Sequence, residues 1–508
     1  MNLLSTTSIF SFYTLISRIL GYVRDILIAV FLGASMFADA FFVAFRIPNT
    51  FRRLFAEGTF NAAFVPSYTS ENTKGKKFSQ KFADEVFNLL LISLLLIVLL
   101  AEIFTPFLVY LIAPGFYSDF TKYTLAVELT RITFPFLLFV SISSFFSGIL
   151  NSNNKFAAAA AAPIILNLIL ISALFFSYYS NLNYTKALSY GVFISGVLQL
   201  IFLIYFSKKF YFPKVRLRFN VNYKVKSFLK KLLPSIFSSG VTQVNILIGT
   251  IIASFQTGAV SYLYYADRVY QINLAIAGVA VSTVSLPLLS KKIKERKNSL
   301  ANDIQNKSLE LSLLLSIPAA LGLIIASHDI VNALFGYGSF RENDVLQTSQ
   351  ALKYFGYGVP AFALVKVLSN LFFARGNTKI PFYISSFIVF LNVSISLIFF
   401  NKLGFLIIPI ATSLSTWIGT IIYLLILIKR KHYVISSRLK VNLLKIILST
   451  IIMSIFLFNV LDFFNAYLDY NNNFKIFYLM FIVILAAIVY IITSYLFGIL
   501  NLKNYKAF

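Results

Sequence analysis

Cysteine is absent from this chain, and histidine is nearly so, with only His328 and His432 among 508 residues. The lack of cysteine excludes disulfides, thiolate metal sites and a cysteine nucleophile. Charge is also scarce: 12% of the residues are charged, against about 25% in soluble domains. Acids are the scarcer sign, with 18 Asp and Glu against 44 Lys and Arg. A soluble enzyme is therefore excluded.

Apolar residues dominate what is present, at 58% of the chain with a mean hydropathy of +0.81. A membrane-spanning helix needs about 20 mainly apolar residues. The apolar runs predict an all-α polytopic membrane protein of about fourteen transmembrane helices. The first, at 7–31, follows no basic segment, so we expect a retained helix and not a cleaved signal peptide. The predicted spans are 7–31, 37–69, 85–112, 123–150, 156–178, 187–207, 228–254, 259–289, 304–326, 346–373, 380–400, 405–428, 442–464 and 475–500.

The basic residues between these spans predict the orientation. Alternate loops and the C-terminal tail hold 28 Lys and Arg, counting Lys230 and Lys231 at the beginning of 228–254. The remaining loops hold five, counting Lys475 at the beginning of the last span. Cytoplasmic loops collect Lys and Arg, so we expect both termini to be cytoplasmic. This asymmetry also accounts for most of the net charge of +26, and no nucleic-acid partner is needed to explain it.

An internal repeat predicts the domain organisation. Pro135 and Asn167 recur as Pro360 and Asn392, each shifted by 225 positions. An even number of helices in the repeat makes the two copies parallel, and parallel repeats hold substrate between the halves. We therefore predict two parallel six-helix lobes, 1–220 and 221–437, around a central cavity, with helices 13 and 14 at 438–508 outside the repeat.

Charges inside spans are the main functional signal, because a charge at membrane depth is costly unless it faces water or a partner. Several arginines in such a cavity favour a phosphate or diphosphate ligand, since the guanidinium binds oxyanions in a bidentate manner. We predict substrate binding by Arg18, Arg24, Arg52 and Arg268, with Asp25, Asp39, Glu57 and Asp267 as supporting or gating residues. The alternative is that each arginine, including Arg46 and Arg53, pairs with a nearby acid or reaches an interface.

The second span contains Arg46-Ile47-Pro48-Asn49. Proline removes a backbone donor and clashes with the preceding turn, so we expect the helix to break here, with Asn49 capping its restart. Free backbone N–H groups would then lie close to Arg52 and favour an anion.

The sequence shows no P-loop and no acid cluster in a loop that could hold a metal. We therefore predict no catalytic residue, no bound metal, no cofactor and no enzyme activity. Energy for transport would come from the membrane potential or an ion gradient.

Three motifs resemble the lipid II flippase family (MurJ, also called MviN), which belongs to the MOP exporter superfamily. The most specific runs from Ala44-Phe45-Arg46-Ile47-Pro48-Asn49 through Arg52-Arg53-Leu54-Phe55-Ala56-Glu57-Gly58 to Ala63-Phe64-Val65-Pro66. The second is Ser261-Tyr262-Leu263-Tyr264-Tyr265-Ala266-Asp267-Arg268. The third begins at Pro360 and continues to Thr378-Lys379. Together with Ser17-Arg18 and Arg24-Asp25, they spread the resemblance over residues 5–400.

The resemblance implies fourteen helices, a V-shaped pair of lobes, and outward flipping of the lipid-linked peptidoglycan precursor across the bacterial inner membrane by alternating access. Family arginines that bind the diphosphate and head group match Arg18, Arg24, Arg52 and Arg268, and family acids important for activity match Asp39 and Glu57. The family's helices 13 and 14 form a groove for the polyprenyl tail. An acid that helps some members bind sodium is replaced here by Gly249, which argues against that sodium site.

Expected partners are lipid II, membrane lipids and proteins of cell-wall synthesis. Three alternatives stay open. Another MOP exporter would carry an O-antigen lipid or a drug, although a cation-drug antiporter would need an acidic cavity. A membrane enzyme acting on the same lipid would need a metal site, and a non-transporting cell-wall scaffold would not need buried arginines.

Overall fold

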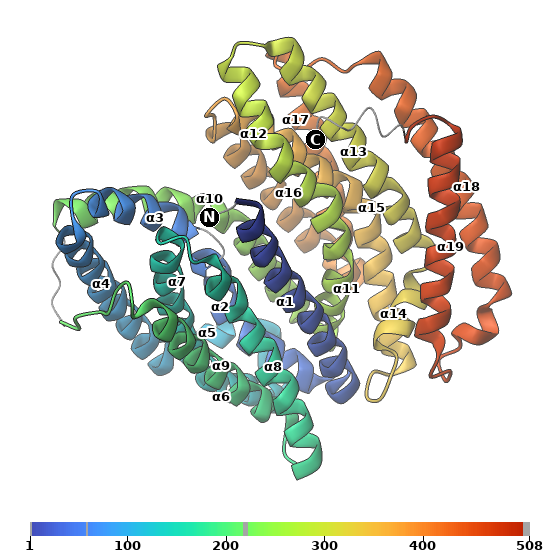
Figure 1. The fold of residues 1–508 in the computed structure, drawn as a ribbon. Helices are drawn as coiled ribbons and strands as arrows, with labels where there is room; N and C mark the ends of the chain where they lie inside the picture. Colours follow the sequence, from blue (N-terminus) through green and yellow to red (C-terminus); the bar gives the residue numbers. More distant parts are fainter. Residues whose placement is uncertain (1–2, 57–58, 217–221, 501–508) are drawn as a thin grey trace. The chain divides into compact units, whose positions relative to one another are not determined.

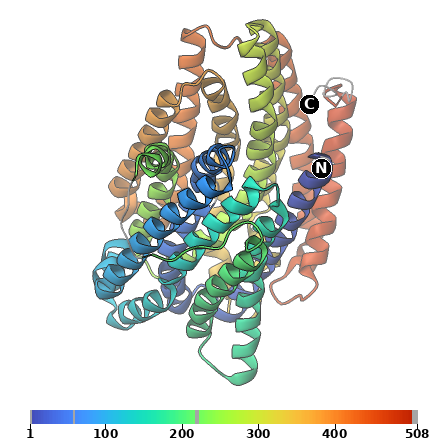
Figure 2. The ribbon, with the colours of Figure 1, turned by 60° about the vertical axis from the view of Figure 1, so that its left-hand side comes forward.

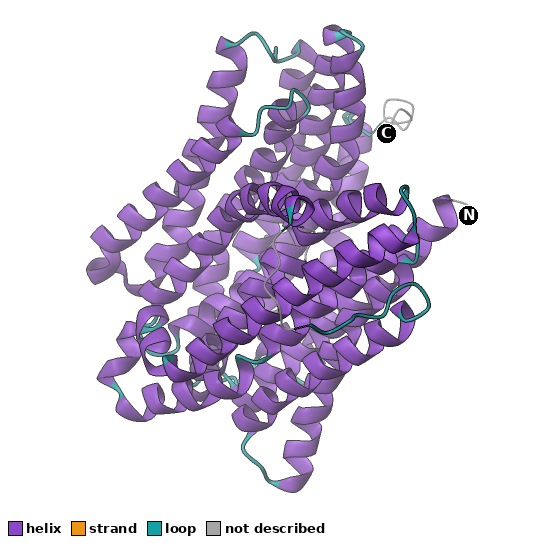
Figure 3. Ribbon diagram, turned by 90° about the vertical axis from the view of Figure 1, so that its left-hand side faces the viewer, coloured by secondary structure: helices purple, strands orange, loops and turns teal. Residues whose placement is uncertain are grey.

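The computed structural model describes residues 3–56, 59–216 and 222–500, which form helices joined by short loops (Figures 1 and 3). No strand occurs in these ranges. Contacts divide the chain into two compact units, Met1–Ser261 and Tyr262–Phe508. The predicted division at 220/221 and the separate segment 438–508 follow the sequence repeat and stay predictions.

The first unit contains ten α-helices, one short 3₁₀ turn and the first residues of α11. Their bounds are α1 (Leu3–Leu32), α2 (Met36–Ala56), α3 (Thr59–Asn72), α4 (Lys76–Ile103), α5 (Thr105–Ile112), η1 (Pro114–Ser118), α6 (Phe120–Thr133), α7 (Phe136–Ser152), α8 (Phe156–Ser180), α9 (Tyr184–Ser207) and α10 (Tyr223–Ala253).

The second unit contains the rest of α11 and the helices that follow it. Their bounds are α11 (Ala259–Leu274), η2 (Ala275–Ala280), α12 (Val281–Lys294), α13 (Asn298–Ile325), α14 (Ser327–Phe335), α15 (Glu342–Phe373), α16 (Lys379–Leu403), η3 (Gly404–Leu406), α17 (Ile407–Lys429), α18 (Ser437–Phe463), η4 (Asn465–Leu468) and α19 (Lys475–Leu496).

Each predicted span overlaps one element or two or three consecutive ones, as 123–150 does with α6 and α7 and 259–289 does with α11, η2 and α12. Ten segments of the described chain are long and apolar enough to cross a membrane. The chain is thus an all-helical polytopic membrane protein, but the exact count of fourteen is not confirmed. Spans at α1, α2 and α10 stay predictions, since these helices are not among the ten segments.

Pro48 does not break α2, so that expectation was wrong. The helix runs without interruption from Met36 to Ala56 with Pro48 inside it. Proline is tolerated in membrane helices because neighbouring groups can satisfy the carbonyl that it frees. Asn49 therefore caps no restart.

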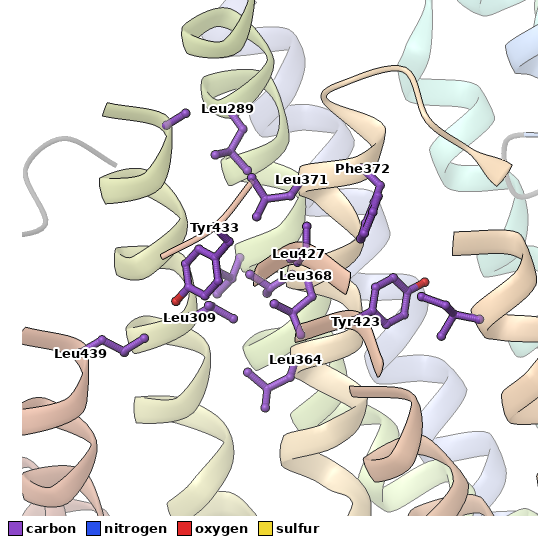
Figure 4. Packing of buried hydrophobic residues seen from close by; sticks show 14 residues of the cluster. Leu289, Leu309, Leu364, Leu368, Leu371, Phe372, Tyr423, Leu427, Tyr433 and Leu439 are labelled. Atoms are coloured by element: carbon purple, nitrogen blue, oxygen red, sulfur yellow. The ribbon is translucent and has the colours of Figure 1, made fainter. Parts of the chain in front are cut away.

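The core of the second unit forms around α15. Leu364, Leu368, Leu371 and Phe372 of this helix are buried against side chains of α12, α13 and α17 (Figure 4). Gly358 lies where an added Cβ would come within 2.5 Å of Ser413 Oγ on α17. This close approach explains why the residue is glycine and why α15 and α17 pack tightly.

The C-terminal helices α18 and α19 lie side by side (Figure 2, red) and pack on α13 and α14 of the same unit. The Tyr490 hydroxyl donates to the carbonyl oxygen of Leu314 at 2.8 Å. The Asn332 amide donates to the carbonyl oxygen of Leu468, also at 2.8 Å. The unrepeated pair is therefore fixed to the second unit by polar contacts as well as by apolar packing.

Candidate functional site

Arg24 and Asp25 form a buried ion pair on α1. Arg24 is 6% exposed and Asp25 is 2% exposed. Arg24 donates from Nε and Nη2 to Asp25 Oδ1 at 3.0 and 2.7 Å, and from Nη1 to Asn167 Oδ1 at 2.9 Å. These bonds use three of the five N–H donors of a guanidinium. The other two N–H groups, one on Nη1 and one on Nη2, are not used by these three bonds.

Asn167, on α8, is a site residue that the sequence marked only as a repeat position. Its Oδ1 accepts from Arg24, and its Nδ2 donates to the carbonyl oxygen of Ser17 at 2.8 Å. One amide therefore fixes both the guanidinium and the backbone of α1 next to Arg18. The sequence feature that could have marked it is that Asn167 follows Pro135 at the same distance at which Asn392 follows Pro360.

Arg18 itself is exposed on α1, and Arg46 and Arg52 are half-buried on α2. Arg52 Nε donates to Asn49 Oδ1 at 3.0 Å, so Asn49 orients this arginine by an i,i+3 contact. Glu57 and the side chain of Arg53 lie outside the described residues. Their expected pairing stays a prediction.

Asp39 is fully buried in the first unit and accepts four hydrogen bonds. Lys122 Nζ donates to Oδ2 at 2.6 Å, and the Gly258 amide donates to the same oxygen at 2.9 Å. The amide and hydroxyl of Ser261 donate to Oδ1 at 2.9 and 2.6 Å. A buried carboxylate needs such charged and neutral donors to offset its desolvation. Asp39 thus joins α2 to α6 and to the beginning of α11.

Lys122 was counted in the sequence only as one of five basic residues in outer loops. Its ammonium is buried between Asp39 and the ring of Phe116, whose centroid lies 4.0 Å from Nζ. The outer loops contain few basic residues, and this was the only feature of the sequence that could have marked Lys122 as a site residue.

Close by in sequence, Gly115 donates its amide to Ser254 Oγ at 3.0 Å, and an added Cβ would collide with the Ser254 backbone at 2.4 Å.

The second unit contributes Asp267 and Arg268 on α11. Arg268 Nη2 donates to the Tyr264 hydroxyl at 2.8 Å, and its guanidinium carbon lies 4.8 Å from the centroid of the Tyr264 ring. Asp267 accepts a hydrogen bond from Gln271. Tyr264 and Gln271 therefore orient the two predicted site residues from positions one turn away.

Within the described ranges, no group of three or more His, Cys, Asp or Glu side chains is arranged to hold a metal ion. The first unit thus carries Arg18, Arg24, Arg52, Asp25 and Asp39, and the second carries Asp267 and Arg268. Side-chain acceptors orient three of the arginines, Arg24, Arg52 and Arg268.

Comparison with known proteins identifies the family. A family model described as "Lipid II flippase MurJ" matches residues 28–479. A protein of Rickettsia prowazekii (strain Madrid E), named "Probable lipid II flippase MurJ", is 38% identical over 510 residues, with 99% of each chain covered. The chain belongs to the MurJ lipid II flippase family. This is a family of transporters rather than enzymes.

Solved structures agree with this membership. One described as "Lipid II flippase MurJ, inward closed conformation" is similar with a TM-score of 0.81 and 31% identity, covering 96% of this chain and 98% of that one. A multidrug resistance MATE family transporter of the MOP superfamily has a TM-score of 0.69 at 16% identity, covering 82% of this chain and 94% of the other. The MATE likeness shows a shared fold alone.

Proposed function

We propose that this chain flips lipid II from the inner to the outer leaflet of the bacterial inner membrane by alternating access. The observation that carries the proposal is the match to the MurJ family over residues 28–479. The apolar helices and the family together make the chain a multi-pass inner-membrane protein. That both termini are cytoplasmic belongs to the proposal and rests on the loop charges.

Arg18, Arg24, Arg52 and Arg268 would bind the diphosphate and head group of the lipid. The buried Arg24 supports this assignment, because Asp25 and Asn167 fix its guanidinium through three of its N–H groups. Charge-assisted bonds from guanidinium to phosphate are among the stronger hydrogen bonds in proteins. Transport also requires that lipid II binds the two end states with different affinity.

Asp25, Asp39, Glu57 and Asp267 would support or gate this process. Asp39 has the clearest support, since the Lys122 ammonium and the groups of Gly258 and Ser261 hold it in one place. The family resemblance alone supports Glu57. Directionality would come from the membrane potential or an ion gradient, and other cell-wall proteins would supply or consume the lipid.

The pair α18 and α19 would provide the surface for the polyprenyl tail. One face of the pair packs on α13 and α14, while many large apolar side chains remain exposed on both helices, such as Leu444, Phe458, Phe477 and Ile484. A long apolar tail is stabilised on such a surface and not beside charged arginines.

The test is replacement of the protein by variants in cells that depend on it, with lipid II measured separately in the two leaflets. Depletion should raise inner-leaflet lipid II and stop growth. Arg24→Ala should insert into the membrane but should restore neither growth nor the normal distribution of lipid II between the leaflets. Lys186→Ala is the matched control, because it removes a cation from the exposed pair with Glu128 and should restore both. Unchanged lipid II distribution on depletion would refute the proposed function.

A further inference from the structure

A segment that follows α9 is tied to the side of α4. Lys208–Arg216, here called the strap, leaves α9 after Ser207. The buried Tyr211 donates its hydroxyl to Asp84 Oδ1 at 2.6 Å, and the amide of Lys214 donates to the same oxygen at 3.2 Å. Burial and the bond to Asp84 raise the pKa of the Tyr211 hydroxyl, so this group remains a neutral donor.

A second residue of α4 repeats this arrangement one turn later. Asn88 Nδ2 donates to the carbonyl oxygen of Lys214 at 2.9 Å, and Asn88 Oδ1 accepts from the amide of Arg216 at 2.6 Å. Backbone groups of the strap thus find partners on α4 in place of water. The strap therefore has a defined conformation with a fixed outer side.

The outer side of the strap combines cations with apolar groups. Lys208, Lys209, Lys214 and Arg216 are exposed. Phe212 is also exposed, at 68%, as is Val215. Hydrogen bonds hold the strap in place, so the exposed ring of Phe212 can contact an apolar surface without any change in the strap. Such a contact is favourable because it removes the ring from water.

The beginning of α10 continues this pattern. Tyr223, Lys226 and Lys230 are exposed at spacing i, i+3 and i+7, with Tyr223 at 86%. Val225, Phe228 and Leu232 are buried at the same spacing on the other face. Residues at this spacing share one helix face, so the basic and aromatic side chains of α10 form a single outward stripe.

The acids of this region are directed inward and already have partners. Glu71 accepts from Lys74 and Lys224 at 2.8 and 2.5 Å. Asp84 binds the strap, and Glu85 accepts from Asn222. Among the described residues, no acid forms an ion pair with Lys208, Lys209, Lys214, Arg216, Lys226 or Lys230. The surface is thus strongly cationic towards the outside.

We propose that the strap and the first turns of α10 bind the phosphate groups of anionic phospholipids in the adjacent membrane leaflet. The strap begins where the apolar span of α9 ends, and Tyr205 and Phe206 are exposed in the last turn of that span. Basic side chains beside a span attract anionic lipids, and tyrosine and tryptophan are enriched at the headgroup level. Phe212 and Tyr223 would enter the interface while the cations pair with phosphate.

The test places a fluorescent probe in the strap of the full chain. The protein has one tryptophan, Trp417, so Phe212→Trp combined with Trp417→Phe gives a single reporter. This protein is reconstituted into phosphatidylcholine bilayers that contain a small share of brominated phosphatidylglycerol or of brominated phosphatidylcholine. We expect brominated phosphatidylglycerol to quench the tryptophan several-fold more strongly.

Two charge variants of this single-tryptophan protein test whether the cations of the strap and α10 cause the stronger quenching by the anionic lipid. Lys208→Gln, Lys214→Gln, Arg216→Gln and Lys226→Gln together should lower the affinity for the anionic quencher at least roughly tenfold, given the attraction of each cation near a lipid surface. The matched control changes Lys291, Lys292, Lys294 and Lys297 to Gln, a cluster in which Lys292 and Lys297 already bind Glu295. The control should retain the preference, and both variants should keep the parent's melting temperature.

Three results would overturn the proposal. Equal quenching by the two lipids would show that Phe212 does not select anionic headgroups. An equal loss in both charge variants would show that net charge alone attracts the lipid. Relief of quenching by added single-stranded RNA, which competes for the same cations, would identify a nucleic-acid surface. Each result is independent of lipid II transport, which the leaflet assay measures separately.

Discussion

Among the described residues, the side chains of two lysines have almost no exposed surface. One lies in each unit, and they are stabilised in different ways. Lys122 in the first unit pairs with the carboxylate of Asp39 at 2.6 Å. Lys475 in the second unit donates to the carbonyl oxygens of Gly336 and Tyr470 at 2.7 and 2.6 Å, and its Nζ lies 4.3 and 4.7 Å from the rings of Tyr337 and Tyr470. The first lysine belongs to an ion pair, whereas the second is solvated by dipoles and aromatic faces.

This difference determines what remains when one partner is removed. Loss of Asp39 leaves an ammonium buried without its counter-charge, which is strongly destabilising. Loss of the Lys475 ammonium leaves only carbonyl groups and rings, which need less compensation. The first unit therefore depends on charge neutrality at this point, and the second depends on an anchor at the beginning of α19.

Asp39→Ala should have the largest effect. Removing one partner of a buried ion pair destabilises a protein by about 3–5 kcal/mol, and we expect thermal unfolding in detergent to shift accordingly. Asp39→Ala with Lys122→Met should regain most of the loss, because no isolated charge stays buried. Lys186→Ala, which breaks an exposed pair, should leave the stability nearly unchanged, because water screens the attraction between exposed charges. A double variant no more stable than Asp39→Ala would contradict the ion-pair explanation.

Lys475→Met should destabilise the chain by about 1–3 kcal/mol, through two lost hydrogen bonds and two lost cation–π contacts. The effect should be local to α18 and α19. The measurement is disulfide formation between one cysteine introduced in α19 and one introduced in α13. The chain has no cysteine of its own, so no other disulfide can form. A loss as large as that of Asp39→Ala would contradict the distinction between the two lysines.

Asn167→Ala should lower flipping roughly tenfold, since it removes one hydrogen bond to a charged group that positions Arg24. Its repeat counterpart Asn392 contacts the hydroxyls of Ser396 and Thr412 at 3.4 and 3.5 Å, and Asn392→Ala should lower flipping less. The leaflet assay for lipid II measures both. Equal losses would mean that the amides serve only helix packing. Asn167→Asp, which retains an acceptor for Arg24, should recover part of the activity.

Glu71 gives the smallest expected effect. Burial raises the pKa of Glu71, but hydrogen bonds and charges from Lys224 and Lys74 outweigh it, so the net pKa is lowered. A lowered pKa means that the stabilisation is present above the ordinary pKa of Glu and is lost as the pH falls through the lowered value. Acidification below about pH 4 should therefore release α10 from α3, as followed by proteolysis near Lys224. Glu71→Gln should remove this pH dependence. If the pH dependence persists in Glu71→Gln, a group other than Glu71 causes it.

Much of the fold follows from local patterns, as α4 and α19 illustrate. Both are long apolar runs bounded by polar residues, and a helix is the structure that satisfies such a run in a membrane. The site is less local. Arg24 and Asp25 are adjacent in the sequence, so their pairing could be expected, whereas Asn167 reaches Arg24 across 143 positions. Pro48 was misjudged because neighbours in space decide whether a proline interrupts a membrane helix.

The sequence by itself determined the class of protein, the approximate positions of most helices, the spacing of the internal repeat and the arginines that are candidates for phosphate binding. These depend on composition and short-range spacing, which the chain carries in every conformation. Only the tertiary structure decided that Lys122, Gly258 and Ser261 meet at Asp39, and that the strap is fixed to Asp84 and Asn88. Such contacts join residues far apart in the chain, and the need of each buried polar group for a partner selects them only once the helices have packed.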